Sequence, residues 1–420
     1  MKINEKVCKN GLKIQAVEIP GTNVVTTLIL AGAGSRYENK EIAGISHFLE
    51  HMFFKGAEKY QTPKDVAEAI DSFGGEFNAF TGKEYAGYYV KSGKENLEKS
   101  LDVLSDMLLR SKFDQSEINK ERGVILEEMA MYLDAPMYQI SWDFEQLVFG
   151  DQPLGRDQIG TKEFINNVQH EDFIKYEKEL YVPENMVICL AGAVNEKTIE
   201  QVEKFFQLKD RKQSREMAKF DENLAQEKFK IRKKKTEQYH VSFGVKTFSE
   251  RDKRFPALKV LGTILGGNMS SRMFQNVRES KGLCYSIRTQ VDEFTDTGLL
   301  TTRAGVKLED VLKAVEAIRF EYDDLLKNGI TDTELENAKN YLCGKSDLST
   351  EDTEEVAHHF AKNSLLYGLV EDFDKEKEII KAVKKSEVEE LAREIFVPEN
   401  FRFAGIGPEV NEGKLLSLIS

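Results

Sequence analysis

Hydrophobic residues recur at helical spacing between Gly44 and Gly56. The apolar positions, three or four residues apart, predict a helix with one buried face; they are Ile45, Phe48, Leu49, Met52 and Phe53. His47, Glu50 and His51 fall on the opposite face. Two imidazoles four residues apart project side by side and can bind one metal ion, and the adjacent carboxylate reaches the same space. The alternative is a buried helix whose histidines are satisfied by their neighbours.

A second long helix is predicted to begin after Asp114, which can cap it. Its residues Glu121 and Glu128 are seven positions apart and so share one face, whereas Glu127 is turned about 100° away. Alone, this pattern also fits an exposed helix face. Combined with the two histidines, one of these glutamates becomes a candidate third metal ligand.

Alternating apolar positions predict strands elsewhere, and segments with a 3.6-residue period predict helices. Strands are expected within residues 11–32 and at 76–81, 84–90 and 240–245, and further helices at 96–110 and 255–265. The segment 255–265 corresponds roughly in position to the candidate metal-binding helix of the first half, but it contains no histidine.

A short motif occurs twice and indicates two related halves. Val182-Pro183-Glu184-Asn185 returns as Val397-Pro398-Glu399-Asn400, a shift of 215 residues, and each copy follows a helical pattern and precedes a strand containing Ala-Gly. Such self-similarity predicts two homologous α/β domains. We expect them at residues 1–215 and 236–420, joined by a charged linker at 216–235.

Composition narrows the class of protein. A chain of 420 residues exceeds one ordinary core, and 40% hydrophobic with 31% charged residues is typical of a soluble globular protein. The net charge of -13 argues against nucleic acid as the main partner. The basic run Lys230 to Lys235 is most simply a solvated linker or strand start.

The cysteines and the lengths of the apolar runs indicate the cellular compartment of the protein. The four cysteines form no Cys-x-x-Cys pair, which fits a reducing environment. The N-terminal residues do not resemble a targeting leader, and no apolar run reaches the roughly 18 residues that span a bilayer. We therefore expect a cytoplasmic protein without a membrane partner.

Together these motifs resemble the pitrilysin/insulinase family of zinc metallopeptidases, the inverzincins, and especially short members similar to the mitochondrial processing peptidase beta subunit and bacterial processing proteases. The most specific parts are His47 to His51 and Glu121 to Glu128. The resemblance implies an α+β fold of two homologous domains, each an antiparallel sheet packed with helices.

The resemblance also implies roles for individual residues. His47, His51 and Glu128 would bind one zinc ion per chain, Glu50 would be the general base, and Glu121 would support the site. Arg278 and Tyr285, in an Arg-x6-Tyr pattern of the second domain, would contact the substrate carbonyl. Asn78, Ala79 and Phe80 match an edge strand that pairs with the substrate backbone.

The implied activity is zinc-dependent hydrolysis of short or unfolded peptides in a closed chamber. Two such chains would form the chamber as a homodimer, in which the second domain of one chain completes the zinc site of the other. A non-catalytic scaffold subunit is the alternative from another class, but such members typically lose ligands or base, and this chain keeps them. A protease dedicated to one precursor peptide also remains open.

Overall fold

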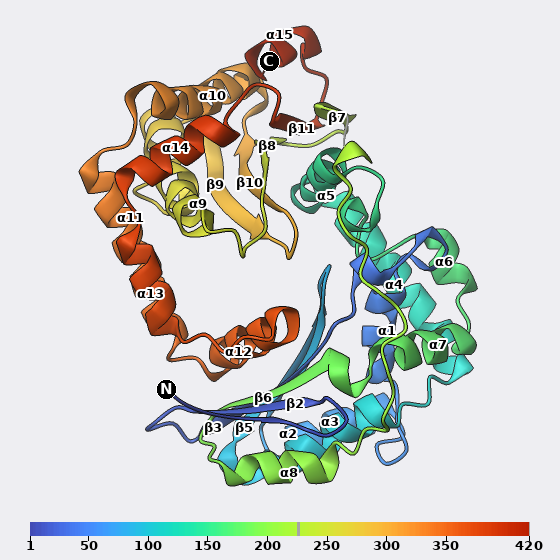
Figure 1. Cartoon of the computed structure of the whole chain (residues 1–420). Helices are drawn as coiled ribbons and strands as arrows, with labels where there is room; N and C mark the ends of the chain where they lie inside the picture. The colour runs from blue at the N-terminus through green and yellow to red at the C-terminus, as the bar shows by residue number, and fades with distance from the viewer. Residues whose placement is uncertain (225–226, 420) are drawn as a thin grey trace. The chain divides into compact units, whose positions relative to one another are not determined.

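The computed structural model describes residues 1–224 and 227–419, so residues 225 and 226 of the predicted linker lie outside the described residues. The chain forms two compact units, each a sheet packed with helices, which confirms the expected α+β class (Figure 1). Unit 1 comprises residues 1–129, 157–218 and 347–373, and unit 2 comprises residues 130–156, 219–346 and 374–420. The domain boundaries at residues 215 and 236 stay a prediction.

The sheet of unit 1 has the strand order β1-β2-β6-β3-β5-β4. The strands are β1 (Lys2–Val7), β2 (Lys13–Glu18), β3 (Val24–Ala31), β4 (Glu76–Thr81), β5 (Ala86–Gly93) and β6 (Met186–Gly192). Contrary to the expected antiparallel sheet, β2 and β6 run parallel. The long helical connection before β6 allows this, because parallel neighbours require a crossover, and β6 then inserts between β2 and β3. Strand β4 forms an edge.

The sheet of unit 2 repeats this plan, with the order β7-β11-β8-β10-β9. Its strands are β7 (Phe229–Lys233), β8 (Tyr239–Thr247), β9 (Cys284–Glu293), β10 (Gly298–Val306) and β11 (Phe401–Gly407). Here β7 and β11 form the parallel pair, and β9 is an edge that corresponds to β4.

The repeated motif occupies the same place in both sheets. Asn185 Nδ2 donates to the Leu180 carbonyl at 2.8 Å just before β6, and Asn400 Nδ2 donates to the Ile395 carbonyl at 3.2 Å just before β11. Each asparagine thereby ties the end of a helix to the start of the central strand that follows it.

The helices follow the predicted segments closely in the first half. Unit 1 contains α1 (Ile45–Phe53), α2 (Pro63–Asp71), α3 (Leu97–Leu109), most of α4 (Gln115–Asp134), α6 (Lys162–Asn167), α7 (His170–Leu180), α8 (Lys197–Phe205) and α12 (Thr353–Tyr367). Unit 2 contains α5 (Pro136–Phe149), α9 (Phe255–Gly262), α10 (Val311–Asn328), α13 (Phe373–Ala382), α14 (Lys385–Ile395), α15 (Glu412–Ile419) and most of α11 (Asp332–Ser349).

The α-helix expected at residues 255–265 is shorter than the range that the hydrophobic pattern predicts. Helix α9 ends at Gly262 and continues as the π-helical turns η7 (Thr263–Gly267) and, after a break, η8 (Met273–Ser280). A Cβ at Gly266 would lie 2.5 Å from the Thr289 nitrogen, so only glycine allows this close approach of the turn to β9.

One face of each sheet is covered by a helix from the opposite half of the sequence. In unit 1, α12 lies against β3 and β6 (Figure 1). Its Val356 and Phe360 pack with Leu28 of β3 and Val187 of β6. In unit 2, α5 occupies the corresponding position: Phe144 and Leu147 pack with Leu299, Ala404 and Ile406. The related halves have thus exchanged equivalent helices, a feature called here the helix exchange.

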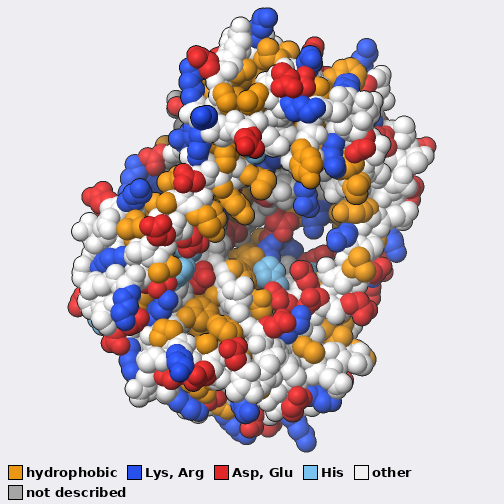
Figure 2. Space-filling view, turned by 180° about the vertical axis from the view of Figure 1, so that it is seen from behind, with side chains coloured by type: hydrophobic (Ala, Val, Ile, Leu, Met, Phe, Trp, Pro, Cys, Tyr) orange, Lys and Arg blue, Asp and Glu red, His pale blue; other side chains and the backbone are white. Residues whose placement is uncertain are grey.

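On the face shown in Figure 2, lysine and arginine side chains are interspersed with acidic ones rather than gathered in one basic field. Within residues 1–224 and 227–419, no helix is both long and apolar enough to cross a membrane.

Candidate metal centre

Helix α1 holds the two histidines through its buried opposite face. Phe48, Leu49, Met52 and Phe53 are fully buried, as the period of the pattern predicts. The rings of Phe48 and Phe173 meet edge to face, with centroids 5.1 Å apart, and those of Phe53 and Tyr88 do so at 5.2 Å. The polar face of the helix is therefore fixed in rotation about its axis.

The start of α1 is anchored by Glu38, a residue that the sequence patterns did not identify. Gly44 precedes the helix with a φ of 107°, and its N–H donates to Glu38 Oε2 at 2.7 Å, while the N–H of Ser46 donates to Oε1 at 2.9 Å. Burial raises the pKa of Glu38, against these hydrogen bonds, which favour its ionised form. A carboxylate here satisfies two helix N–H groups and complements the positive end of the helix dipole.

Replacing Glu38 by alanine should destabilise the protein by about 2–6 kcal/mol, because two buried N–H donors lose their acceptor at about 1–3 kcal/mol each. Thermal unfolding followed by circular dichroism measures this effect. The exposed Glu41, on the turn that follows, supplies the matched control Glu41→Ala. Equal unfolding temperatures for the two variants would show that Glu38 does not hold the helix start.

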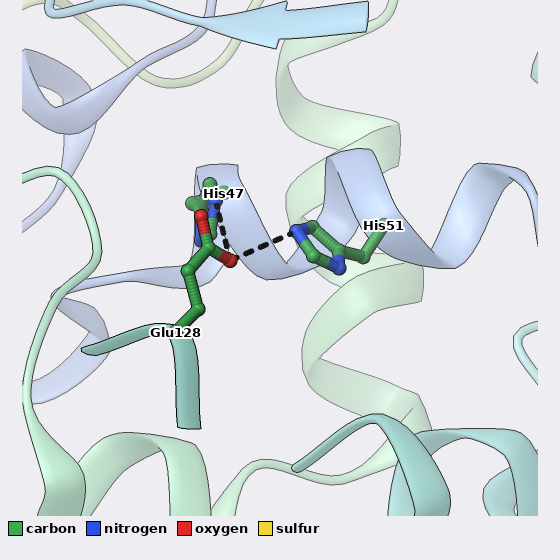
Figure 3. Close-up of side chains that lie close together, drawn as sticks. All are labelled: His47, His51 and Glu128. Atoms are coloured by element: carbon green, nitrogen blue, oxygen red, sulfur yellow. Dashed lines mark ion pairs between the residues drawn. The ribbon is translucent and has the colours of Figure 1, made fainter. Parts of the chain in front are cut away.

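His47, His51 and Glu128 come together, with ligand atoms of all three within 4.8 Å of one another. Glu128 Oε2 lies 3.7 Å from His47 Nε2 and 3.5 Å from His51 Nε2, and the carboxylate approaches from α4 toward both rings on α1 (Figure 3). Around a tetrahedral zinc ion, nitrogen and oxygen ligands stand about 3.3–3.6 Å apart. The three side chains therefore fit one zinc ion and leave a fourth position open.

The protonation of the cluster suits metal binding. Burial, reinforced by the nearby His51, lowers the pKa of His47 to about 3, so this imidazole is neutral at physiological pH. Neutral imidazole is the form that binds metal. His47 Nδ1 is buried and has no hydrogen-bond partner among the described residues.

Glu121 orients the second histidine. His51 Nδ1 lies 2.8 Å from Glu121 Oε1, which directs Nε2 toward Glu128. Lys55 Nζ lies 2.6 Å from the other oxygen of Glu121. Burial alone would raise the pKa of Glu121, but His51 and Lys55 hold it below its usual value. A carboxylate behind a metal-binding histidine fixes its tautomer, and the sequence did not indicate the contribution of Lys55.

Glu50 lies beside this cluster and touches the edge strand. The Thr81 hydroxyl, at the end of β4, donates to Glu50 Oε2. Burial raises the pKa of the Glu50 carboxyl and outweighs this hydrogen bond, which lowers it. Thr81 is a further residue that sequence reasoning missed; it directly follows the predicted substrate-binding residues Asn78, Ala79 and Phe80, all on β4.

The two remaining predicted residues lie in unit 2, whereas all the others lie in unit 1. Arg278 on η8 and Tyr285 on β9 are brought together, with the guanidinium carbon 6.0 Å from the tyrosine ring centroid and 4.3 Å from that of Phe274. Tyr285 is 78% exposed, so its hydroxyl is accessible to a ligand.

Comparison with family models matches most of the chain in two parts. Residues 13–162 match the model described as "Insulinase (Peptidase family M16)", and residues 167–342 match "Peptidase M16 inactive domain". The match of the second part to an inactive domain agrees with its sequence, because α9, which corresponds in position to α1, contains no histidine.

Curated relatives extend over nearly the full length. An uncharacterized zinc protease of Bacillus subtilis, YmxG, is 38% identical over 97% of this chain and 99% of its own. An uncharacterized zinc protease of Streptomyces coelicolor is 35% identical over 92% of this chain and 85% of its own length.

Among solved structures, a protease from Helicobacter pylori has a TM-score of 0.88 at 24% identity, covering 97% of this chain and 99% of that chain. A peptidase M16 inactive domain from Pseudomonas fluorescens has a TM-score of 0.89 at 16% identity, covering 98% of each. These two similarities concern the fold.

Proposed function

The chain belongs to the insulinase family, peptidase family M16, and we propose that it is a zinc-dependent endopeptidase that hydrolyses short or unfolded peptides. The observation that carries this proposal is the convergence of His47, His51 and Glu128, with the Glu50 carboxyl alongside. A structural zinc site would be closed by four protein ligands, whereas three ligands are typical of a catalytic site.

His47, His51 and Glu128 would hold one zinc ion per chain. When bound, zinc supplies Lewis acidity, which makes water more acidic and polarises a carbonyl. Glu50 acts as the general base: its carboxylate accepts the proton from the attacking water and passes it to the leaving amine. Burial raises the pKa of the Glu50 carboxyl, and this is the direction that suits a group that both accepts and releases a proton.

The substrate backbone is proposed to add to β4 as a further antiparallel or parallel strand. Because β4 pairs only with β5 among the described strands, its outer N–H and C=O groups can bind an extended peptide. The hydrogen bond from Thr81 to Glu50 supports this assignment, since it ties the end of the docking strand to the base. Asn78, Ala79 and Phe80 would lie along the bound peptide.

Arg278 and Tyr285 are proposed to stabilise the oxyanion that develops from the substrate carbonyl. Their proximity and the exposure of Tyr285 support a shared role. Donors aimed at developing negative charge contribute a few kcal/mol each in other enzymes.

Digestion of a mixed library of unstructured peptides tests the proposed function. The purified protein should cleave many of them, lose this activity when a chelator removes the metal, and regain it when zinc is added back. Mass spectrometry of the products identifies the cleaved bonds. No cleavage by the zinc-loaded protein would favour the scaffold alternative, and cleavage of one precursor alone would favour the dedicated protease.

We further propose that the active form is a closed homodimer in which Arg278 and Tyr285 of each chain serve the partner's zinc site. Glu50→Gln and Tyr285→Phe chains should each be poorly active and should recover part of the activity when co-expressed. In a mixed dimer, one site would carry both changes and the other neither. A monomer in sedimentation velocity, or no recovery on co-expression, would contradict the dimer.

A further inference from the structure

Unit 2 contains a cavity of about 620 Å³ between the start of α5 and the sheet face at β8, β9 and β10. A volume in this range accommodates a small ligand or one part of a peptide. Among the described residues that line the cavity, three are arginines and none is acidic; the arginines are Arg278, Arg288 and Arg303.

Two of these arginines stand in an unfavourable arrangement. Arg288 on β9 and Arg303 on β10 are direct cross-strand partners in the antiparallel register, on the face that α5 covers. Like charges directly opposite each other on neighbouring strands repel and destabilise the sheet. Such a pair is expected where a ligand, rather than the fold, supplies the compensating charge.

The protein itself neutralises this pair only weakly. Arg288 is exposed and forms no ion pair within the described part of the chain. Arg303 Nη2 lies 3.4 Å from Asp292 Oδ2, at the long end of hydrogen-bond distance, and Asp292 does not line the cavity. Arg303 Nε is buried and has no hydrogen-bond acceptor among the residues that the structure describes. Both guanidinium groups therefore retain donors for an anion.

The rest of the lining suits a ligand that also has apolar groups. Met137, Tyr138 and Tyr285 are 61%, 51% and 78% exposed and form an apolar rim. His240 and Ser286 add hydrogen-bonding atoms without adding a formal charge, since burial lowers the pKa of His240 and keeps it neutral. An extended chain that bears one carboxylate can contact both the arginines and the apolar rim, whereas a bare inorganic ion can contact only the arginines.

We infer that this cavity binds a carboxylate of a peptide, with Arg288 and Arg303 as its direct partners. The carboxylate is either the C-terminus of the peptide or an aspartate or glutamate side chain, since both offer two oxygens to paired guanidinium groups. The inference rests on the proposed peptidase function and adds a substrate class to it. The net charge of -13 would favour basic peptides, but the local lining, not the net charge, decides what this cavity binds.

Binding of matched peptides to full-length Glu50→Gln protein tests the inference. Four labelled peptides share one sequence and differ in a free or amidated C-terminus and in an internal glutamate or glutamine. The peptide with the recognised carboxylate should bind about 10- to 100-fold more tightly than its uncharged counterpart. This range corresponds to the free energy that hydrogen bonds to charged groups typically contribute. The pair that shows the difference identifies which carboxylate is bound.

Arg288→Gln and Arg303→Gln should each remove this preference and leave binding of the uncharged peptide unchanged. Arg393→Gln, at a 59% exposed arginine on α14, is the matched control and should preserve it. Arg288→Gln should also unfold at the same temperature as the parent or higher, because it relieves the cross-strand repulsion. This measurement separates loss of recognition from loss of the fold.

Equal binding of all four peptides, or a preference that survives both arginine substitutions, would overturn the inference. Stronger competition by inorganic phosphate than by acetate would also overturn it, because the cavity would then be a phosphate site. Hydrolysis of the four peptides by the unsubstituted protein reports separately on the proposed function: cleavage without preference contradicts only the carboxylate site, and no cleavage contradicts the peptidase.

Discussion

Glu50→Gln should lower kcat/KM for peptide hydrolysis by about 10²- to 10⁴-fold, the range typical of removing a general base, while the protein stays folded and binds zinc. Glutamine has nearly the same shape, and its amide oxygen can still accept the hydrogen bond from Thr81. It cannot accept the proton of water. Hydrolysis of a fluorogenic peptide and zinc content by atomic emission measure the two effects separately.

The control for this change is Glu127→Gln, at an exposed glutamate on α4. It should alter neither activity nor zinc content. Near-normal hydrolysis by Glu50→Gln would exclude Glu50 as the base, and loss of its zinc would instead indicate a role in holding the metal.

Glu128→Gln should cause the largest loss of zinc, because it removes the only anionic ligand of the three. Glu121→Gln should weaken zinc binding by about 10- to 100-fold, the effect typical of changing the partner of a metal-binding histidine. Glu127→Gln should bind zinc normally. Competition titrations with a chromophoric chelator give the three affinities.

This order of zinc affinities is specific to the assignment. Equal losses in the Glu127 and Glu128 variants would show that the effect comes from α4 as a whole. If the Glu121 variant lost more zinc affinity than the Glu128 variant, Glu121 would be the ligand and Glu128 the supporting carboxylate.

The residues of the metal cluster were predictable because each set is local in sequence. His47 and His51 are one helical turn apart, and Glu121 and Glu128 are two turns apart, so helical periodicity alone places each pair on one face. That the two faces meet follows from the resemblance to a known family, not from the periodicity.

The residues that support the cluster were not predictable in the same way. Glu38 acts through an irregular segment before α1, and Thr81 reaches Glu50 from a strand whose neighbours depend on the tertiary fold. No short-range period marks such contacts. The parallel pair β2 and β6 escaped prediction for a related reason, since strand direction within a sheet is set by a connection of more than 150 residues.

The helix exchange was equally invisible to pattern analysis. Helices α5 and α12 each have buried and exposed faces, and nothing in their residues says which sheet they cover. Their equivalence lies in the tertiary fold, where α12 covers the sheet of unit 1 and α5 covers the corresponding face of the sheet of unit 2.

The helix exchange also sets the order in which the nascent chain can fold. The last strand of the first sheet ends at Gly192, but the helix that covers one face of that sheet ends at Tyr367. At about 5–20 residues per second, roughly 10–35 seconds of translation separate the two. For that time Leu28 and Val187 lack the helix that packs on them, so the first half completes its fold only after most of the second half has been synthesised.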